Sequence, residues 1–421
     1  MSYHPQLIFL LLLTYFRITS QTSFSELDRP ITCQAHDSAS LNNAIDTCCK
    51  AGDYQSPSQV LIDSGVGIIS EGPLIIPCSN IILNVTGTLK FTDEFSDYPL
   101  VDYLPSYGEG RDVPTEKSYH PLIYGERIEN VSIVGSGVID GNGGKWWREH
   151  FRKGLNYSRP PLIEVQYVNH FRIEGVKIRD SPFWTVHPYA SEEVFVKGVE
   201  IENPGWSPNT DGVDVDSCKN VHISNCVFRV GDDGISIKSG LNEAGREFGV
   251  PSENIHIENV TVHPMFDNLS TNGISIGSEM SGSVRNVTVK NVTIHSCESG
   301  IYIKSMEGRG GVVEDVKVED VVMNTVLQGL RLSMNYMYRR GRRGLRGEAN
   351  SSTPHFRNIA FKNITGTNVL EAGFIVGLKQ SVIRNVSLTD VSLESKLGWT
   401  CFSTTGTFAN VEPAPPEKCF R

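Results

Sequence analysis

The feature that most constrains the fold is an eight-residue phrase that recurs along the chain. Each copy alternates apolar and variable residues around a central turn residue, and neighbouring copies are mostly 23 to 34 residues apart. The copies begin at Phe171, Val194, Val221, Ile255, Val287, Val316, Ile359 and Val386. Two short strands meeting at an Asn, Asp or Gly corner, repeated at this period, predict a right-handed parallel β-helix whose coils stack at roughly 4.8 Å.

Three segments depart from the repeat. Residues 40–50 have the apolar spacing of a short amphipathic helix, which we expect to cap the open N-terminal end of the solenoid. Residues 92–120 and 331–346 are rich in Tyr, Gly and charge, and they predict excursion loops. A β-sandwich is the rival architecture, but its hairpin signals, such as Asn-Gly between strands, are scarce. The sequence therefore favours an all-β solenoid over a sandwich.

The N-terminus predicts secretion. An apolar run at 7–13 followed by small residues near position 20 is typical of a signal peptide, and it is too short for a membrane anchor. We therefore expect a signal peptide at 1–20 and a single β-helix domain at 21–421, with no membrane association after signal removal. Of the Asn-x-Ser/Thr sequons, we expect glycans at the loop-like ones, Asn156, Asn268 and Asn350.

Nine cysteines fit a secreted chain, and their odd number leaves at least one thiol without an intramolecular partner. Two pairs that are close in sequence are interpreted as local disulfides: Cys218 with Cys226, and Cys401 with Cys419. The pairing among the four N-terminal cysteines cannot be deduced. No pair has the C-x-x-C spacing of a zinc site.

The net charge of −10 argues against nucleic acid as a partner but does not exclude an acidic polysaccharide, because local charge matters more than the total. Nothing in the composition indicates an oligomer, and a monomer is expected.

Three aspartates are the strongest candidates for chemistry. Asp211 and the pair Asp232-Asp233 stand among small residues in segments that otherwise predict buried strand. Burying an unpaired carboxylate costs several kcal/mol, which favours a functional reason for them. Asp211 and Asp232 are 21 residues apart, about one coil, so we expect them to stack with roughly 5–10 Å between carboxyl groups.

That separation includes the distance expected of an inverting glycosidase and overlaps the retaining one, so spacing alone leaves the stereochemistry open. Crowded carboxylates raise one another's pKa, which lets one act as an acid while another acts as a base. Asp214 and Asp216, by contrast, are expected only to accept hydrogen bonds from backbone N–H groups at corners.

At these residues the chain resembles glycoside hydrolase family 28, the polygalacturonase family. The resemblance rests on Asn209-Thr210-Asp211 and Gly231-Asp232-Asp233, and it extends to the segments at 137–143, 159–161, 181–184, 235–240 and 273–282. It implies a right-handed parallel β-helix and inverting hydrolysis of α-linked galacturonide bonds in pectic polysaccharide. It further implies that Asp232 protonates the leaving oxygen, while Asp211 and Asp233 hold and deprotonate the attacking water. The resemblance implies no metal and no cofactor.

The resemblance also suggests substrate-binding residues, and here the chain departs from the family. Asn209 and Lys238 match the pattern. Asn272 replaces a His found in many members, and Tyr302 with Lys304 stands where an Arg-x-Lys pair usually grips the substrate carboxylate. Lys304 keeps a point charge, but the planar bidentate partner is lost, and Tyr302 is expected to stack on a sugar face instead.

Other polar groups stay open at this point. His187 is either a cleft residue or a hydrogen-bonded core histidine, and Glu279 and Arg309 are equally undecided. Trp146 and Trp147 are expected to pack rather than to bind substrate.

The leading hypothesis is a secreted pectin hydrolase, with exo action favoured over endo action because the long loops can close one end of a groove. The alternative is a catalytically weak β-helix that binds pectic polysaccharide or an inhibitor. A pectate lyase is disfavoured, because that chemistry needs calcium and a basic residue, and these motifs differ from its pattern.

Overall fold

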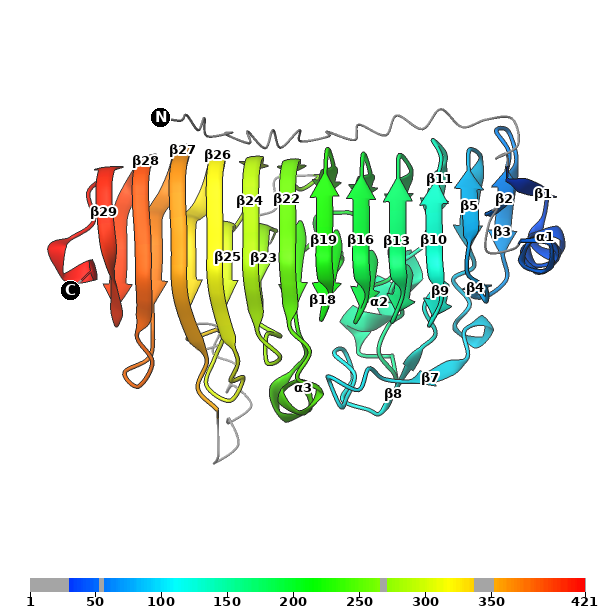
Figure 1. Cartoon of the computed structure of the whole chain (residues 1–421), viewed down its shortest axis with the longest axis horizontal. Coiled ribbons are helices and arrows are strands. Elements are labelled where there is room, and N and C mark those ends of the chain that lie inside the picture. The colour runs from blue at the N-terminus through cyan, green and yellow to red at the C-terminus, as the bar shows by residue number, and fades with distance from the viewer. Residues whose placement is uncertain (1–29, 53–56, 266–270, 337–351, 421) are drawn as a thin grey trace, which may run out of the picture.

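The computed structural model describes residues 30–52, 57–265, 271–336 and 352–420. Its strands stack along one long axis as the coils of a solenoid (Figure 1). Every neighbouring pair in the large sheet is parallel, and the pairings join each coil to the next along three ladders. The predicted right-handed parallel β-helix is thus confirmed. The predicted signal peptide at 1–20, Asn268, Asn350 and most of the Arg-rich segment lie outside the described residues.

The first ladder contains the N-terminal strand of each repeat phrase. Its strands are β1 (Ile31–Ala35), β2 (Ser58–Ile62), β5 (Ile81–Val85), β10 (Glu129–Val134), β13 (Asn169–Glu174), β16 (Glu192–Lys197), β19 (Lys219–Ser224), β22 (Ser252–Val262), β24 (Val284–His295), β26 (Val312–Ser333), β27 (His355–Val376), β28 (Ile383–Phe402) and β29 (Thr404–Glu412). The later strands are long because they continue around a corner into the neighbouring ladders.

The second ladder contains the strand that follows the corner. Its separate strands are β3 (Gly67–Ser70), β6 (Thr88–Phe91), β11 (Val138–Asp140), β14 (Lys177–Arg179), β17 (Glu200–Glu202) and β20 (Val227–Arg229). The third ladder closes each coil with β4 (Leu74–Ile76), β9 (Ile123–Glu126), β12 (Ile163–Gln166), β15 (Val186–Tyr189), β18 (Val213–Asp216), β21 (Ile235–Lys238), β23 (Asn272–Ile276) and β25 (Ser299–Lys304).

Asparagines make the corners between the first and second ladders. Asn225, Asn259 and Asn291 have φ between 52° and 56°, the left-handed region that asparagine tolerates better than most residues. The corner side chains also bond from coil to coil, as where Asn291 Nδ2 donates to Asn259 Oδ1 at 2.6 Å. The turn residue in the repeat phrase therefore serves both the backbone corner and the stacking.

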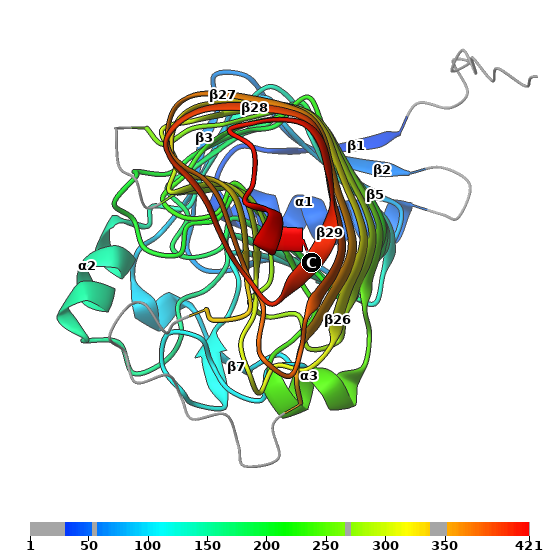
Figure 2. The ribbon, with the colours of Figure 1, turned by 90° about the vertical axis from the view of Figure 1, so that its left-hand side faces the viewer.

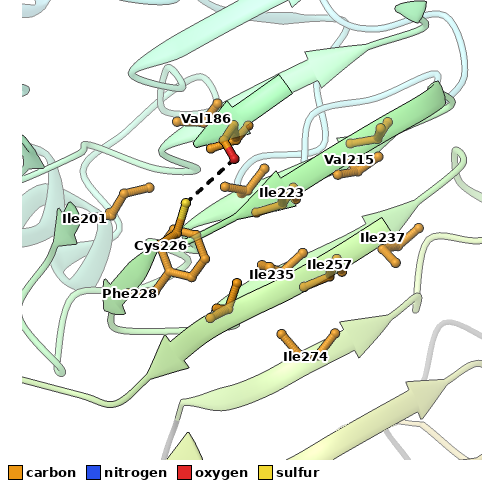
Figure 3. Close-up of a cluster of buried hydrophobic side chains, with 14 of the residues drawn as sticks. Val186, Ile201, Val215, Ile223, Cys226, Phe228, Ile235, Ile237, Ile257 and Ile274 are labelled. Atoms are coloured by element: carbon orange, nitrogen blue, oxygen red, sulfur yellow. Dashed lines mark hydrogen bonds between the residues drawn. The ribbon is translucent and has the colours of Figure 1, made fainter. Parts of the chain in front are cut away.

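The inward side chains form apolar stacks through the solenoid. Ile223 pairs in register with Ile257, and Ile235 with Ile274, and all four are buried (Figure 3). Identical spacing in successive coils keeps the same face inward, because a one-residue slip would turn the apolar set outward.

Both ends of the stack are covered. Helix α1 (Ser38–Ala51) begins at the capping residue Asp37 and closes the N-terminal end, as predicted (Figures 1 and 2). Disulfides Cys33–Cys48 and Cys49–Cys78 tie this helix to the first coils. The C-terminal end is closed by η4 (Glu417–Phe420), which the predicted disulfide Cys401–Cys419 holds in place.

The predicted disulfide between Cys218 and Cys226 is wrong. Both thiols are free and buried, as is Cys297. The two cysteines flank strand β19, whose six residues span about 20 Å, whereas a disulfide needs Cα atoms within about 7 Å. The prediction relied on closeness in sequence, but in an extended strand each residue adds about 3.3 Å, so residues that are near in sequence lie far apart.

Excursions from the coils gather along one edge of the solenoid (Figure 1). They include η2 (Phe95–Asp97), an antiparallel hairpin of β7 (Leu100–Asp102) and β8 (Lys117–Tyr119), α2 (Gly144–Arg152) and α3 (Asn242–Phe248). The predicted loop at 92–120 is thus an excursion with its own short strands. The expected loop start at Arg331 is corrected, since this residue lies in β26 and pairs with Tyr302.

Candidate active site

The candidate site lies where the chain enters the third ladder. Asp211 comes just before β18, and Asp232 and Asp233 come just before β21 on the next coil. Val213 pairs with Ile235, so the offset between these coils is 22 residues. Asp233, rather than the expected Asp232, therefore stands in register with Asp211, one residue from our prediction.

The three carboxylates converge on one another. One oxygen from each lies within 4.8 Å of the others, which is closer than the expected 5–10 Å. Asp211 and Asp233 are 3% and 1% exposed. A small cavity opens beside them, and its walls include six of the residues that the sequence singled out: Asn209, Asp211, Asp232, Asp233, Lys238 and Lys304.

Asp233 is the carboxylate with the strongest support for its charge. Lys304 Nζ lies 2.7 Å from its Oδ2, and Asn272 Nδ2 donates to its Oδ1 at 2.8 Å. Burial alone would raise the pKa of Asp233, but the charges of Lys304 and Lys238 and these hydrogen bonds hold it below its ordinary value. Asn272 thus has a defined contact, behind the cavity rather than in its wall.

The other two aspartates are shifted in the opposite direction. Burial, and then the charge of Asp233, raise the pKa of Asp232 to about 6. Burial and the charges of Asp214 and Asp232 raise the pKa of Asp211 well above its usual range. Neighbouring carboxyl groups whose pKa values are pushed apart have the pattern of an acid and base pair.

Lys238, in β21, lies among the acidic groups of the site. Its Nζ lies 3.3 Å from Asp214, 3.5 Å from Glu279 and 4.0 Å from Asp211, and 4.6 Å from the centre of the Trp184 ring. The ammonium groups of Lys238 and Lys304 therefore offset part of the negative charge of the carboxylate cluster.

The expectation for Asp214 and Asp216 is wrong. Neither acts as a corner cap for backbone N–H groups. Asp214 faces Lys238, and Asp216 accepts a hydrogen bond from Tyr107 at 2.5 Å. Both lie inside β18, where the backbone N–H groups already serve the ladder.

His187 is a buried, bonded histidine rather than a cleft residue. Its Nδ1 lies 2.7 Å from Glu164, and its Nε2 lies 3.5 Å from Asp216. Burial would lower the pKa of His187, but the two carboxylates outweigh it and raise the pKa to about 9. His187 therefore carries a charge that balances the acidic row beneath the site.

Tyr302 does not reach the cavity wall. It is 3% exposed, and the guanidinium of Arg331 lies 4.1 Å from the centre of its ring. Arg331 is itself held by Glu298 at 2.9 Å. The predicted contact of Tyr302 with a sugar stays a prediction, and the structure gives the ring a packing role.

Residues that the sequence analysis did not single out complete the cavity. They are Arg111 and Asp112 from the hairpin excursion and Tyr336 after β26, while Phe183 and Trp184 come from the segment at 181–184 that the family resemblance included. Glu279, left undecided above, also lines it and forms a close ion pair with Arg111. No sequence signal links position 111 to position 211, because the excursion folds back over a hundred residues.

Arg159 fixes this wall from beneath. It is fully buried, and it binds Asp112 with Nε at 2.6 Å and Nη2 at 2.9 Å. The same guanidinium donates to the side-chain oxygen of Asn209 at 3.1 Å. Asn209 has a φ of 54°, and this bond holds its turn in place beside Asp211. Trp146 and Trp147 are buried, which confirms their packing role.

A larger cavity, of about 600 Å³, lies next to the site on the side of the earlier coils. It shares Phe183 and Trp184 with the small cavity, and the β7–β8 hairpin forms its outer wall. Tyr103, Tyr124 and Tyr167 contribute aromatic surface to it. The volume falls within the range of small-molecule binding sites.

Comparison with known proteins agrees with this geometry. The sequence matches the family described as glycosyl hydrolases family 28 over residues 59–412. A probable polygalacturonase of Vitis vinifera is 33% identical over 341 residues, covering 80% of this chain and 68% of that protein. An exopolygalacturonase of Zea mays is 26% identical, covering 80% and 75%.

Solved structures share the fold of this chain. A hyperthermoactive exopolygalacturonase from Thermotoga maritima superposes with a TM-score of 0.78 at 29% identity, covering 91% of each chain. An endo-xylogalacturonan hydrolase from Aspergillus tubingensis, at 17% identity and a TM-score of 0.66, shares the fold and covers 93% of this chain and 98% of its own.

Proposed function

Since the chain belongs to the glycosyl hydrolases of family 28 and is a polygalacturonase-like glycoside hydrolase, we propose that it cleaves α-linked galacturonide bonds of pectin with inversion. The observation that carries this is one buried cluster in which oxygens of Asp211, Asp232 and Asp233 lie within 4.8 Å of one another and Lys304 Nζ lies 2.7 Å from Asp233. Lys304 holds the pKa of Asp233 down while burial raises that of Asp232 to about 6, which favours an ionised Asp233 beside a protonated Asp232. Both states are needed at once for a single displacement.

Asp232 is the general acid. With a pKa of about 6, it is protonated in the mildly acidic range, and it lies within the cavity wall where a glycosidic oxygen can approach. Its proton passes to the leaving oxygen as the bond from that oxygen to the anomeric carbon breaks.

Asp233 is the general base, and Asp211 holds the attacking water. The water oxygen bonds to the anomeric carbon, its proton passes to Asp233, and Asp232 is left as a carboxylate. One proton then returns from Asp233 to Asp232 through solvent, which restores the starting state. The close approach of the three groups lets one water contact Asp211 and Asp233 together.

Arg111 binds the substrate carboxylate in place of the arginine that many family members have at position 302, where this chain has Tyr302. It is the single arginine among the described residues of the small cavity, and its side chain is 31% exposed. Its ion pair with Glu279 fixes the guanidinium and leaves other N–H donors of the five free for a planar carboxylate. Lys304 and Lys238 add positive charge at the same wall.

Exo action fits the larger cavity. The β7–β8 hairpin walls it on the side of the earlier coils, so a polysaccharide would meet a closed pocket there rather than an open groove. The pocket would take the end of a chain, and its tyrosines offer sugar-stacking faces. Three disulfides among the described residues fit a secreted protein, which is where pectin is found.

A second candidate function follows from Tyr302. A chain without the usual arginine at this position would bind pectic polysaccharide or an inhibitor while cleaving weakly. Loss of that arginine removes a bidentate contact near the scissile bond. The two proposals differ in whether Arg111 takes over the contact.

Reducing-sugar release from polygalacturonate tests the proposal. We expect release by the wild-type protein, with or without a chelator, and a loss of about 10²–10⁴-fold in Asp232→Asn. Product length separates exo from endo action, and the anomer first seen by proton NMR reports inversion. No release from any pectic polymer would leave the binding function as the better proposal.

Arg111→Lys separates the two proposals further. We expect KM for polygalacturonate to rise about tenfold, because a bidentate contact to the carboxylate becomes a point charge. KM for a methyl-esterified oligomer should change little, since it offers no carboxylate. Equal changes on both substrates would assign Arg111 to wall structure instead.

A further inference from the structure

On the first ladder, two histidines and a glutamate converge on one point outside the proposed active site. His222 lies in β19 and His256 in β22, and the two are direct register partners on neighbouring coils. Glu258 follows two residues after His256, so both side chains leave the strand on the same outward face. Figure 1 shows β19 and β22 side by side.

The three side chains face one another in bonding geometry. His222 Nε2 lies 3.3 Å from Glu258 Oε1, and His256 Nε2 lies 3.3 Å from Glu258 Oε2. The two imidazole ring centres are 5.1 Å apart. One ligand atom from each residue lies within 4.8 Å of the others.

From these distances we propose that His222, His256 and Glu258 form a site for a borderline divalent transition-metal ion, best matched by Zn²⁺. Ligand atoms about 2.0–2.2 Å from zinc, at tetrahedral angles, are about 3.3–3.5 Å apart. Each histidine Nε2 already lies at this distance from one of the two Glu258 oxygens, His222 from Oε1 and His256 from Oε2. Two imidazoles with one carboxylate also form the donor set that selects such an ion over calcium or magnesium.

The surroundings leave the site open. The histidines and Glu258 are between 34% and 40% exposed, so a fourth position is available to water. In the neighbouring strands, Phe195 and Thr288 flank the histidines, and Ser224 and Lys290 stand in register with Glu258. Lys290 is the charged group among these four, and it is exposed, which lets its ammonium turn toward solvent.

A bound ion would link two coils that also carry the proposed catalytic groups. Strand β19 continues from the coil of Asp211, and β22 continues from the coil of Asp232 and Asp233. The link lies on a different ladder from the cavity, so its effect would be on stability rather than on chemistry. Histidine binds a metal ion through its neutral form, so binding should weaken in acid.

Isothermal titration of the untagged, chelator-washed protein with zinc chloride tests this. Near neutral pH we expect one ion per chain with a micromolar Kd, and at about pH 5 a Kd at least tenfold weaker. The His222→Gln, His256→Gln double variant should lose the binding, and Glu258→Gln should weaken it at least tenfold. Calcium chloride should give no heat.

Two controls separate this site from others. His295→Gln removes a histidine of intermediate exposure outside the cluster and should keep the wild-type Kd. Asp232→Asn should keep it as well, because the acidic cavity takes no part. The melting temperature should rise with zinc in the wild type and stay constant in the double variant. Zinc binding that survives the double variant, or none at millimolar zinc, overturns the proposal.

Discussion

The first and third ladders are built from the same kind of short parallel strand, yet their outward faces differ. In β13 and β16 of the first ladder, exposed or half-exposed residues alternate with buried ones. In β18, β21 and β25 of the third ladder, every residue is buried. The excursions that gather along one edge supply the cover, since Leu104, Tyr107 and Leu241 pack on Phe183, Trp184 and Tyr189.

The difference shows how burial under the excursions changes the protonation of ionisable side chains. On the open face, Lys197 and Glu174 lie 3.4 Å apart with half and a third of their side chains exposed, so solvent screens them. On the covered face, burial raises the pKa of Asp211 and Asp232, and paired carboxylates raise that of His187. Burial beneath the excursions thus shifts the pKa values of side chains that would titrate normally on an exposed strand.

The largest expected contrast is in rate. Asp233→Asn on the covered face should lower kcat about 10²–10⁴-fold, because it removes the proposed base. Glu174→Gln on the open face should leave kcat within twofold. Steady-state hydrolysis of polygalacturonate measures both, with circular dichroism to confirm folding. A covered-face variant with wild-type kcat would break the comparison.

The next contrast is in stability against pH. The pKa of His187 in the folded state, about 9, is above its ordinary 6.5, so its stabilisation is complete below pH 6.5 and is lost as pH rises through 9. The shift corresponds to about 3 kcal/mol. Denaturant unfolding across this pH range should show the loss, and His187→Gln should flatten the dependence and lower stability in acid.

His295→Gln is the matched control for that experiment, since it lies outside the row. It should keep the wild-type pH dependence. Equal behaviour of the two variants would mean that His187 does not carry the buried charge.

The smallest contrast concerns the open ion pair. A double-mutant cycle on Glu174→Gln and Lys197→Met should give a coupling free energy of about 0–1 kcal/mol. Chemical denaturation at low and high salt would measure it, and the coupling should shrink with salt. A coupling of several kcal/mol would show that the open face is less screened than its exposure indicates.

The sequence predicted the solenoid because its repeat carries the fold locally. The phrase that starts at Val221 specifies an inward Ile223, a corner at Asn225 and an outward His222, and all three appear as such. The aspartates were located for the same reason, since they interrupt that pattern. The register of Asp211 with Asp233 was missed by one residue, because the coil length at this point depends on turn geometry.

The sequence could not predict where the excursion segments fold back over the third ladder. Arg111 reaches the cavity from an excursion, and no local pattern says where an excursion folds back. The failed pairing of Cys218 with Cys226 has a related cause, since sequence distance says little about spatial distance in extended chain. The alignment of His222 with His256 was visible in the repeat, but two histidines at matching positions become a cluster only once the register is known.

The pH dependence of kcat/KM on polygalacturonate tests the central claim, that burial raises the pKa of Asp232 while the neighbouring lysine charges hold that of Asp233 down. The account predicts a bell-shaped pH profile. Its alkaline limb, from loss of the Asp232 proton, lies near pH 6, and its acid limb, from protonation of Asp233, lies below pH 3.8. In Lys304→Met the acid limb should move to higher pH, because Asp233 loses the charge and the hydrogen bond that lower its pKa. The alkaline limb should move in the same direction, because the charge of Lys304 also lowers the pKa of Asp232. A profile without an alkaline limb near pH 6, or one that Lys304→Met leaves in place, would contradict it.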